Sequence, residues 1–152
     1  MLKALANVFS GLAGEQAQAS AEVREHDLRL ATALLLVEIA RADHKLEAVE
    51  QTAIAELLGA RFTLSEDEVD ALVSQAEEVA DHTASFQAFT RQLNEEITAE
   101  EKLQIVEMLW QVAFADNELS KYEDSLVRKL CDLLYVSHRD VIRIRNRVVL
   151  EL

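Results

Sequence analysis

Acidic side chains recur at two places in the chain with matched spacing, 73 residues apart. Each place follows an apolar helical run and begins with Ala-Asp, and a Leu comes three residues after the Asp. The acidic positions are Asp43, Glu47 and Glu50 in the first copy, and Asp116, Glu118 and Glu123 in the second. Carboxylate oxygens are the ligands that Ca²⁺ and Mg²⁺ prefer in proteins. One interpretation is therefore a divalent-cation site formed by these six residues.

The same residues also fit a structural role in two connections between helices. His44 and Asn117 occupy equivalent positions, and Asn in particular tolerates the positive φ that a helix end requires. Glu50 and Glu123 would lie in the first turn of the following helix, where a negative charge meets the positive end of the helix dipole. Neither copy matches the twelve-residue EF-hand loop, and each alone offers too few oxygens, so a tight site requires both turns to converge. Both interpretations remain open.

Composition indicates that helices must position these turns. The chain has 152 residues with no Pro and only three Gly, whereas sheet proteins need abundant turn residues. Half of the residues are hydrophobic, which is enough for a core, and the length fits one domain. We predict an all-α fold, a bundle of about seven helices.

Periodicity and capping residues place the expected helices. A long core helix should run from about 21 to 42, and the next from about Glu47 to Gly59, where glycine would close it. A short helix is expected near 86–93. Ser or Thr followed three residues later by an acid marks the start of the other helices; these pairs are Ser65 with Glu68, Thr98 with Glu101, Ser120 with Glu123, and Ser137 with Asp140.

The chain also contains an internal repeat. Residues 27–57 laid over 100–130 without gaps give eight identities in 31 pairs, and the match continues with a one-residue deletion. We therefore predict a duplicated three-helix unit, with repeats at about 27–73 and 100–145 inside a single domain of residues 21–152. Residues 1–20 should form an N-terminal amphipathic helix and a connector.

Charge is distributed unevenly along the chain. The net charge of −13 opposes nonspecific binding to nucleic acid or anionic lipid. Residues 61–101 carry a net −9, and residues 138–152 carry a net +2. The acidic segment is either a solvated face or half of a neutralising contact with the basic C-terminal helix, within a chain or between chains.

Other chemistry is sparse, and we predict no enzyme. The four His residues have no zinc-ligand spacing, and the single Cys131 lies in an apolar run as a core thiol would. The sequence has no Gly-rich phosphate loop. No stretch reaches the roughly 20 apolar residues of a membrane span, and the N-terminus lacks the pattern of a secretory signal. A single Cys suits a reducing cytoplasm.

These residues resemble the TerB-like family of bacterial tellurite-resistance B proteins, in its broader branch. The resemblance covers roughly residues 22–140 and rests on the run Leu28–Leu35 leading to Ala42-Asp43, and on Leu109–Asp116 followed by Leu119-Ser120. It implies an all-helical, duplicated, acidic protein that is not catalytic. The family usually has Gly after each turn Asp, where this chain has His44 and Asn117.

The resemblance also implies a role in stress or tellurite resistance, through assembly with partners near the inner membrane and through metal binding. We therefore expect a cytoplasmic interaction module, peripheral to that membrane, that docks other proteins or a second copy of itself. The alternative is a sensor of Ca²⁺ or Mg²⁺ that uses the two acidic turns.

Overall fold

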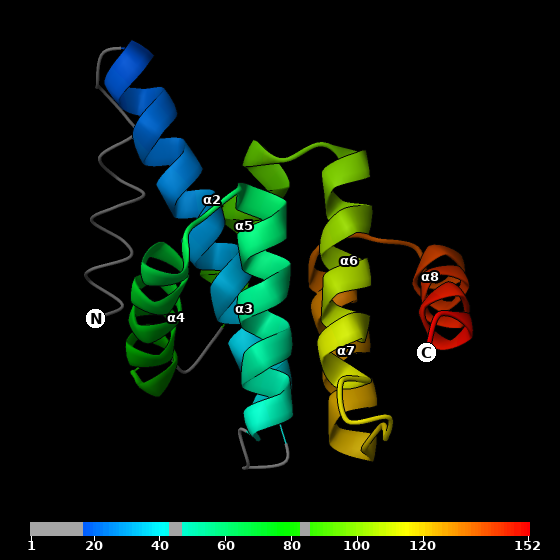
Figure 1. The fold of residues 1–152 in the computed structure, drawn as a ribbon. Coiled ribbons are helices and arrows are strands. Elements are labelled where there is room, and N and C mark those ends of the chain that lie inside the picture. The colour runs from blue at the N-terminus through cyan, green and yellow to red at the C-terminus, as the bar shows by residue number, and fades with distance from the viewer. Residues whose placement is uncertain (1–16, 43–46, 83–85) are drawn as a thin grey trace.

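The computed structural model describes residues 17–42, 47–82 and 86–152, and within these ranges every regular element is a helix. The helices are α2 (Ala17–Ala40), α3 (Ala48–Phe62), α4 (Glu66–Asp81), α5 (Gln87–Glu96), α6 (Ala99–Ala113), α7 (Lys121–Leu133) and α8 (His138–Leu150) (Figure 1). The all-α prediction is confirmed.

The core is built around α2 and α6, the two most apolar runs. Leu36 on α2 and Leu109 on α6 are both fully buried, and the two helices contact one another. Because α2 also contacts α3, α4, α5 and α7, its second half is apolar on nearly all sides, as a central helix must be.

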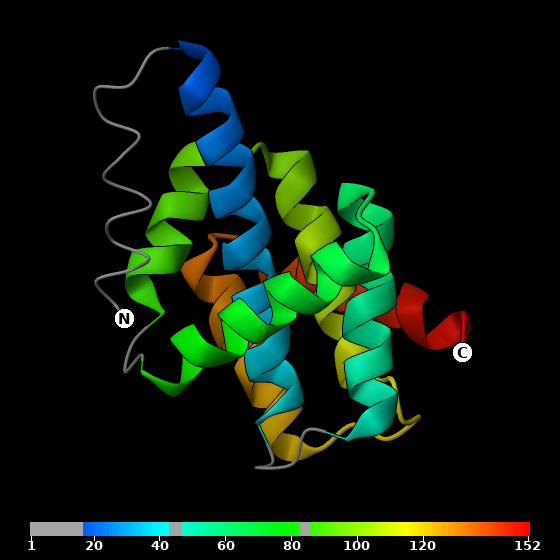
Figure 2. The same cartoon turned by 60° about the vertical axis from the view of Figure 1, so that its left-hand side comes forward.

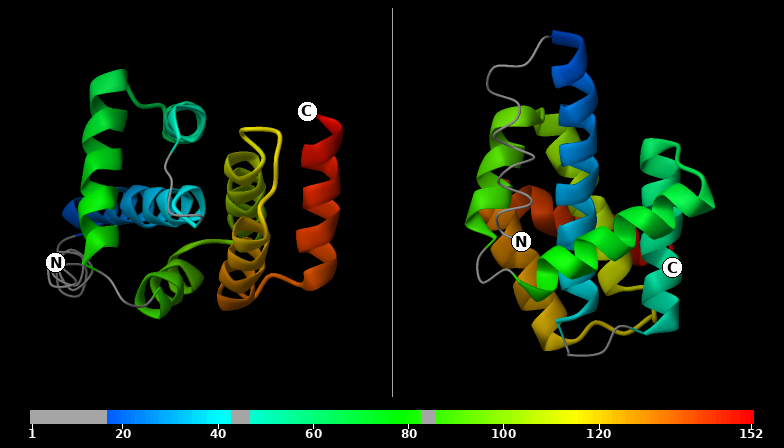
Figure 3. Two further views of the ribbon diagram at one scale, coloured as in Figure 1. Left: turned by 90° about the horizontal axis from the view of Figure 1, so that it is seen from below. Right: turned by 90° about the vertical axis from the view of Figure 1, so that its left-hand side faces the viewer.

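The remaining helices wrap this central pair in a repeated order. In the first half α3 and α4 pack on α2, and in the second half α7 and α8 pack on α6. Helices α4 and α8 lie on opposite sides of the molecule, as the view from below shows (Figure 3). Helix α5 joins the halves and packs on α2 and α7.

Helix starts follow the predicted caps. Ser65, Thr98 and Ser120 each accept a hydrogen bond from the backbone N–H three residues on, and the Glu at that position accepts one from the cap backbone N–H. Ser137 accepts from the Asp140 N–H at 3.2 Å. Each cap satisfies backbone donors that the first helical turn leaves unpaired.

The end of helix α3 differs from the prediction. Gly59 does not close α3, which continues to Phe62 and ends with Thr63 in the left-handed conformation, at φ 55°. The Leu64 N–H reaches back to the Gly59 carbonyl at 3.1 Å, and Leu64 packs on the core. This hydrophobic contact, rather than glycine, fixes the end of the helix.

The second half repeats this ending. Tyr135 has φ 57°, and the Val136 N–H donates to the Cys131 carbonyl at 3.0 Å. Helix starts also recur, because the N-cap positions Glu47 and Ser120 are 73 residues apart. The matched ends are those expected of a duplicated three-helix unit.

The N-terminal boundary was predicted too late. Helix α2 begins at Ala17, so residues 17–20 are helical rather than part of a connector. Ala and Gln in this stretch are good helix formers, which explains the extension. The amphipathic helix predicted at the start of residues 1–20 lies outside the described residues.

Candidate functional site

The described helix ends that flank the two acidic turns lie at one end of the bundle. The end of α2, the starts of α3 and α7, and the end of α6 all point to that end (Figures 1 and 2). The predicted positions Glu47, Glu50, Asp116, Glu118 and Glu123 therefore share this end of the molecule, whereas Asp43 lies outside the described residues.

In the second turn the acidic side chains bind backbone groups. Asp116 Oδ1 accepts a hydrogen bond from the Glu118 N–H at 3.0 Å, which stabilises the turn. Asn117 has φ 62°, as predicted for this position, and Glu118 is exposed. Leu119 packs against the core below the turn.

The two helix-start glutamates are the buried members of the set. Glu50 and Glu123 are both third residues of their helices and are 3% and 4% exposed. Glu123 Oε1 accepts from the Ser120 N–H at 3.3 Å, and the Glu123 N–H donates to Ser120 Oγ at 3.0 Å. Glu47, the N-cap of α3, makes no side-chain cap and is exposed.

The described acidic residues do not assemble a cation site by themselves. Among residues 17–42, 47–82 and 86–152, no three His, Cys, Asp or Glu side chains gather as a metal-binding group. Ca²⁺ takes six to eight oxygens, and here Asp116 and Glu123 already accept backbone hydrogen bonds. The geometry of the described residues fits helix capping better than metal coordination.

Helix α4 carries the strongest charge in the structure. It has seven acidic residues and no Lys or Arg. Asp81 forms an ion pair at 2.7 Å with Arg41, the residue that follows helix α2. The Glu68 carboxylate accepts a hydrogen bond from the Ser65 N–H and so completes the capping box. The others form no ion pair with the described residues: Glu66, Asp67, Asp70, Glu77 and Glu78.

Helix α8 occupies the equivalent place in the second half and has the opposite charge. It carries four Arg and one Asp. Arg147 pairs with Glu107 on α6 at 3.3 Å, and the Arg145 guanidinium lies over the rings of Trp110 and Phe114, 5.8 and 5.5 Å from their centroids. The basic helix therefore makes an ion pair within the chain, but with Glu107 of α6. It makes none with the described residues of the acidic segment 61–101, so the predicted contact with that segment is not formed within one copy.

The Trp110 side chain also fixes α8 to the core. It is fully buried, and its indole N–H donates to the Val141 carbonyl at 3.1 Å. Cys131 is likewise fully buried, and burial raises the pKa of its thiol to about 12. A thiol with so high a pKa is protonated at neutral pH, which suits a core residue rather than a nucleophile.

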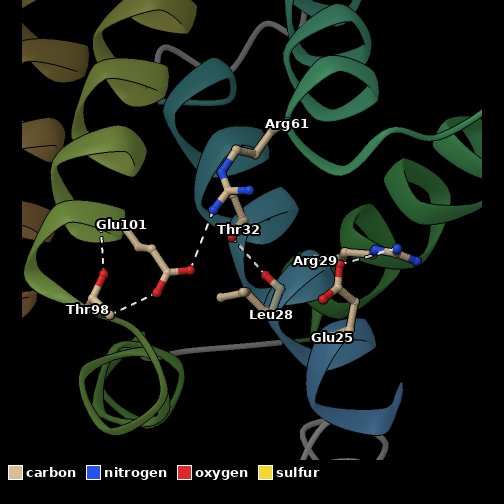
Figure 4. Close-up of polar contacts among 7 residues, drawn as sticks. All are labelled: Glu25, Leu28, Arg29, Thr32, Arg61, Thr98 and Glu101. Atoms are coloured by element: carbon tan, nitrogen blue, oxygen red, sulfur yellow. Dashed lines mark hydrogen bonds and ion pairs between the residues drawn. The ribbon is translucent and has the colours of Figure 1, made fainter. Parts of the chain in front are cut away.

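One acidic side chain joins the two halves. Glu101 on α6 accepts the Thr98 N–H at 2.9 Å through Oε1, and its Oε2 pairs with Arg61 on α3 at 3.6 Å (Figure 4). Both partners are about one-third exposed, so the ion pair orients the helices more than it stabilises them.

Sequence reasoning missed Asp27, a buried carboxylate on α2. It is 2% exposed, and neither carboxylate oxygen has a hydrogen-bond partner among the described residues. Burial, and then the charge of Glu96 on α5, raise the pKa of Asp27 to about 6. Its register gave the signal, since Leu30, Ala31 and Leu34 follow at three, four and seven residues on the buried face.

A groove runs between α3 and α4. Its volume is about 560 Å³. Small or apolar residues, among them Ala55, Gly59 and Val69, line its floor, and carboxylates of both helices stand beside them. A Cβ on Gly59 would lie 3.6 Å from Val69 Cγ2, so glycine keeps the groove open rather than preventing a clash.

These features define an acidic, all-helical protein with two equivalent halves. The chain belongs to the TerB family, because the family described as tellurite resistance protein TerB matches residues 29–146. The match spans both halves, from α2 into α8, and confirms the predicted family. No match was found among curated proteins or solved structures. No helix in the described part of the chain is long and apolar enough to cross a membrane.

Proposed function

We propose that this TerB protein is a non-enzymatic interaction module whose acidic α4 face docks basic protein partners. The observation that carries the proposal is the negative charge on α4 that no ion pair with the described residues neutralises. Five carboxylates of α4 are exposed or partly exposed to solvent, and they form no ion pair with the described residues. Concentrating like charges costs free energy in the isolated protein, and a basic partner relieves that repulsion.

The proposal fits the family as well as the surface. Family membership supports a TerB-like role, which we extend to protein assembly in stress or tellurite resistance, in the cytoplasm and at the periphery of the inner membrane. Steering by a charged face speeds association with an oppositely charged partner, and this advantage falls as salt increases.

Affinity capture from the native cell tests this function. The parent protein should retain partners that a charge-neutralised variant loses, with Glu66, Glu77 and Glu78 changed to Gln and Asp67 and Asp70 to Asn. Circular dichroism should show that the variant is still helical. Equal recovery of every partner by both proteins would contradict a docking role for α4.

The second candidate function is a divalent-cation sensor. The burial of Glu50 and Glu123 at equivalent helix starts, at the same end of the bundle, favours it. Asp43, Glu47, Asp116 and Glu118 would have to supply the other oxygens. Calorimetric titration with Ca²⁺ and Mg²⁺ separates this function from the first, because a cation that binds the folded state also stabilises it.

A further inference from the structure

We propose that the α3–α4 groove binds helix α8 of a second copy of this chain, so that copies associate head to tail. This inference rests on the proposed function and names one partner for the acidic face. The groove and α8 belong to equivalent parts of the two halves, yet their charges are opposite. Helix α4, which forms one wall of the groove, and helix α8 lie on opposite sides of the molecule, so one copy cannot join the two surfaces itself (Figures 1 and 3).

The exposed side of α8 has the composition of a docking helix. Arg139, Arg143 and Leu150 are four and seven residues apart, a spacing that places them on one helical face. All three are exposed, and Leu150 is 87% exposed. The stripe is basic at its start and apolar at its end.

The groove offers matching groups. Glu66 and Asp70 on α4 are exposed and four residues apart, the same spacing as Arg139 and Arg143. Four residues of α-helix rise about 6 Å, so both pairs of opposite charges can meet when the helices lie side by side. The same groove is lined by the small or apolar residues Ala55, Gly59 and Val69, the kind of surface that suits Leu150 of the other copy.

The ion pair that the α8 stripe makes within one copy competes only weakly with the proposed contact to the groove. Arg143 pairs with Asp140 on its own helix at 3.2 Å, and both side chains are exposed. Exposed ion pairs of this kind contribute little, so exchange for a carboxylate of another copy is inexpensive. Arg139 has no ion pair with the described residues.

The geometry also determines the form of the assembly. The contact joins two different surfaces, so it is heterologous, and helices α4 and α8, which carry them, lie on opposite sides of the molecule. A pair of copies can therefore make the contact only once, and further copies extend a chain. The net charge of −13 opposes association, but at about 0.15 M salt the Debye length is about 8 Å, so distant charges are screened while contacting pairs persist.

Sedimentation velocity on charge-swap variants tests the proposal. The parent should exceed its monomer mass of 17.1 kDa as concentration rises from micromolar to millimolar, and should return toward it in about 0.5 M NaCl. A groove variant (Glu66→Lys with Asp70→Lys) and a stripe variant (Arg139→Glu with Arg143→Glu) should each stay monomeric.

Mixing the variants gives the decisive measurement. The groove variant has a basic groove and a basic stripe, and the stripe variant has an acidic groove and an acidic stripe. Each variant repels itself, but an equimolar mixture has two matched contacts, both between unlike variants, and should form chains in which the two alternate. A variant carrying all four swaps should form chains again. The matched control is Glu95→Lys with Asp132→Lys, which makes the same charge change on exposed residues outside the groove and should associate at least as well as the parent.

A parent that stays monomeric at millimolar concentration would show that the groove does not take a second copy. A dimer that survives in both charge-swap variants would equally overturn the inference. If the monomeric parent still captures a cellular protein that the groove variant loses, the groove serves a different partner. The proposed function then stands while the head-to-tail contact is wrong.

Discussion

Thr63 and Tyr135, 72 residues apart, end their helices in the same left-handed conformation, with φ of 55° and 57°. In each case the next residue donates its N–H to a carbonyl five residues earlier. The register of 72 rather than 73 agrees with the one-residue deletion inferred between the halves. Local geometry thus supports duplication independently of sequence identity.

Replacing Thr63 with Gly should stabilise the protein. A β-branched residue at positive φ is strained by about 1–2 kcal/mol, and glycine relieves this while losing about 0.5–1 kcal/mol of chain entropy. We expect a gain of about 0.5–1 kcal/mol in the free energy of unfolding, measured in urea. Thr52→Gly is the matched control, because Thr52 is exposed inside α3 and the same change there should destabilise. A loss of stability in Thr63→Gly would refute the strain.

Replacing Asp27 with Asn should stabilise the protein at neutral pH but not at low pH. The pKa of Asp27 is raised from 3.8 to about 6 in the folded state, so the folded protein holds this proton more tightly than the unfolded chain. The parent therefore loses stability as pH rises from about 4 to 6, by at most about 3 kcal/mol.

Urea denaturation at pH 3.5 and pH 7.5 checks the Asp27 prediction. The difference in unfolding free energy between the Asp27→Asn variant and the parent protein should grow with pH and level off above the raised pKa. Asp132→Asn, at an exposed carboxylate, is the control and should show no comparable trend. A pH-independent difference at Asp27 would mean that its carboxyl is not desolvated in solution.

Replacing Leu36 or Leu109 with Ala should destabilise the protein by about 2–5 kcal/mol. Both side chains are fully buried on the two contacting core helices, so truncation leaves a cavity. Leu150→Ala removes the same atoms from an exposed side chain and should change stability by less than about 0.5 kcal/mol. Equal effects at buried and exposed positions would mean that the core has been misassigned.

Neutralising the acidic turns should separate capping from cation binding. The variant carries Asp43→Asn, Glu50→Gln, Asp116→Asn and Glu123→Gln. If these residues act only as caps, each should contribute about 0.3–1 kcal/mol to the free energy of unfolding, and Ca²⁺ should change the thermal stability of neither the parent nor the variant. As ligands, they should give the parent a thermal stabilisation in millimolar Ca²⁺ or Mg²⁺ that the variant lacks. Micromolar binding in the parent, abolished in the variant, would make the sensor function primary.

The sequence alone determined the elements whose causes are local. A capping box needs only a hydroxyl and a carboxylate three residues apart, so the starts at Ser65, Thr98 and Ser120 could be read directly. The all-apolar run of α2 likewise predicted a central helix, and repeated spacing revealed two equivalent halves. None of these inferences depends on which distant segments meet.

The tertiary structure decided what depends on packing between distant segments. Asp27 is buried in the folded bundle, and its pKa is raised further by Glu96 on α5, 69 residues away. The end of α3 predicted from sequence was wrong, because the packing of Leu64, and not Gly59, ends the helix. The sequence also could not predict that α4 and α8 lie on opposite sides of the molecule, because the number of charges on each helix determines neither the orientation of the helices nor the distance between them.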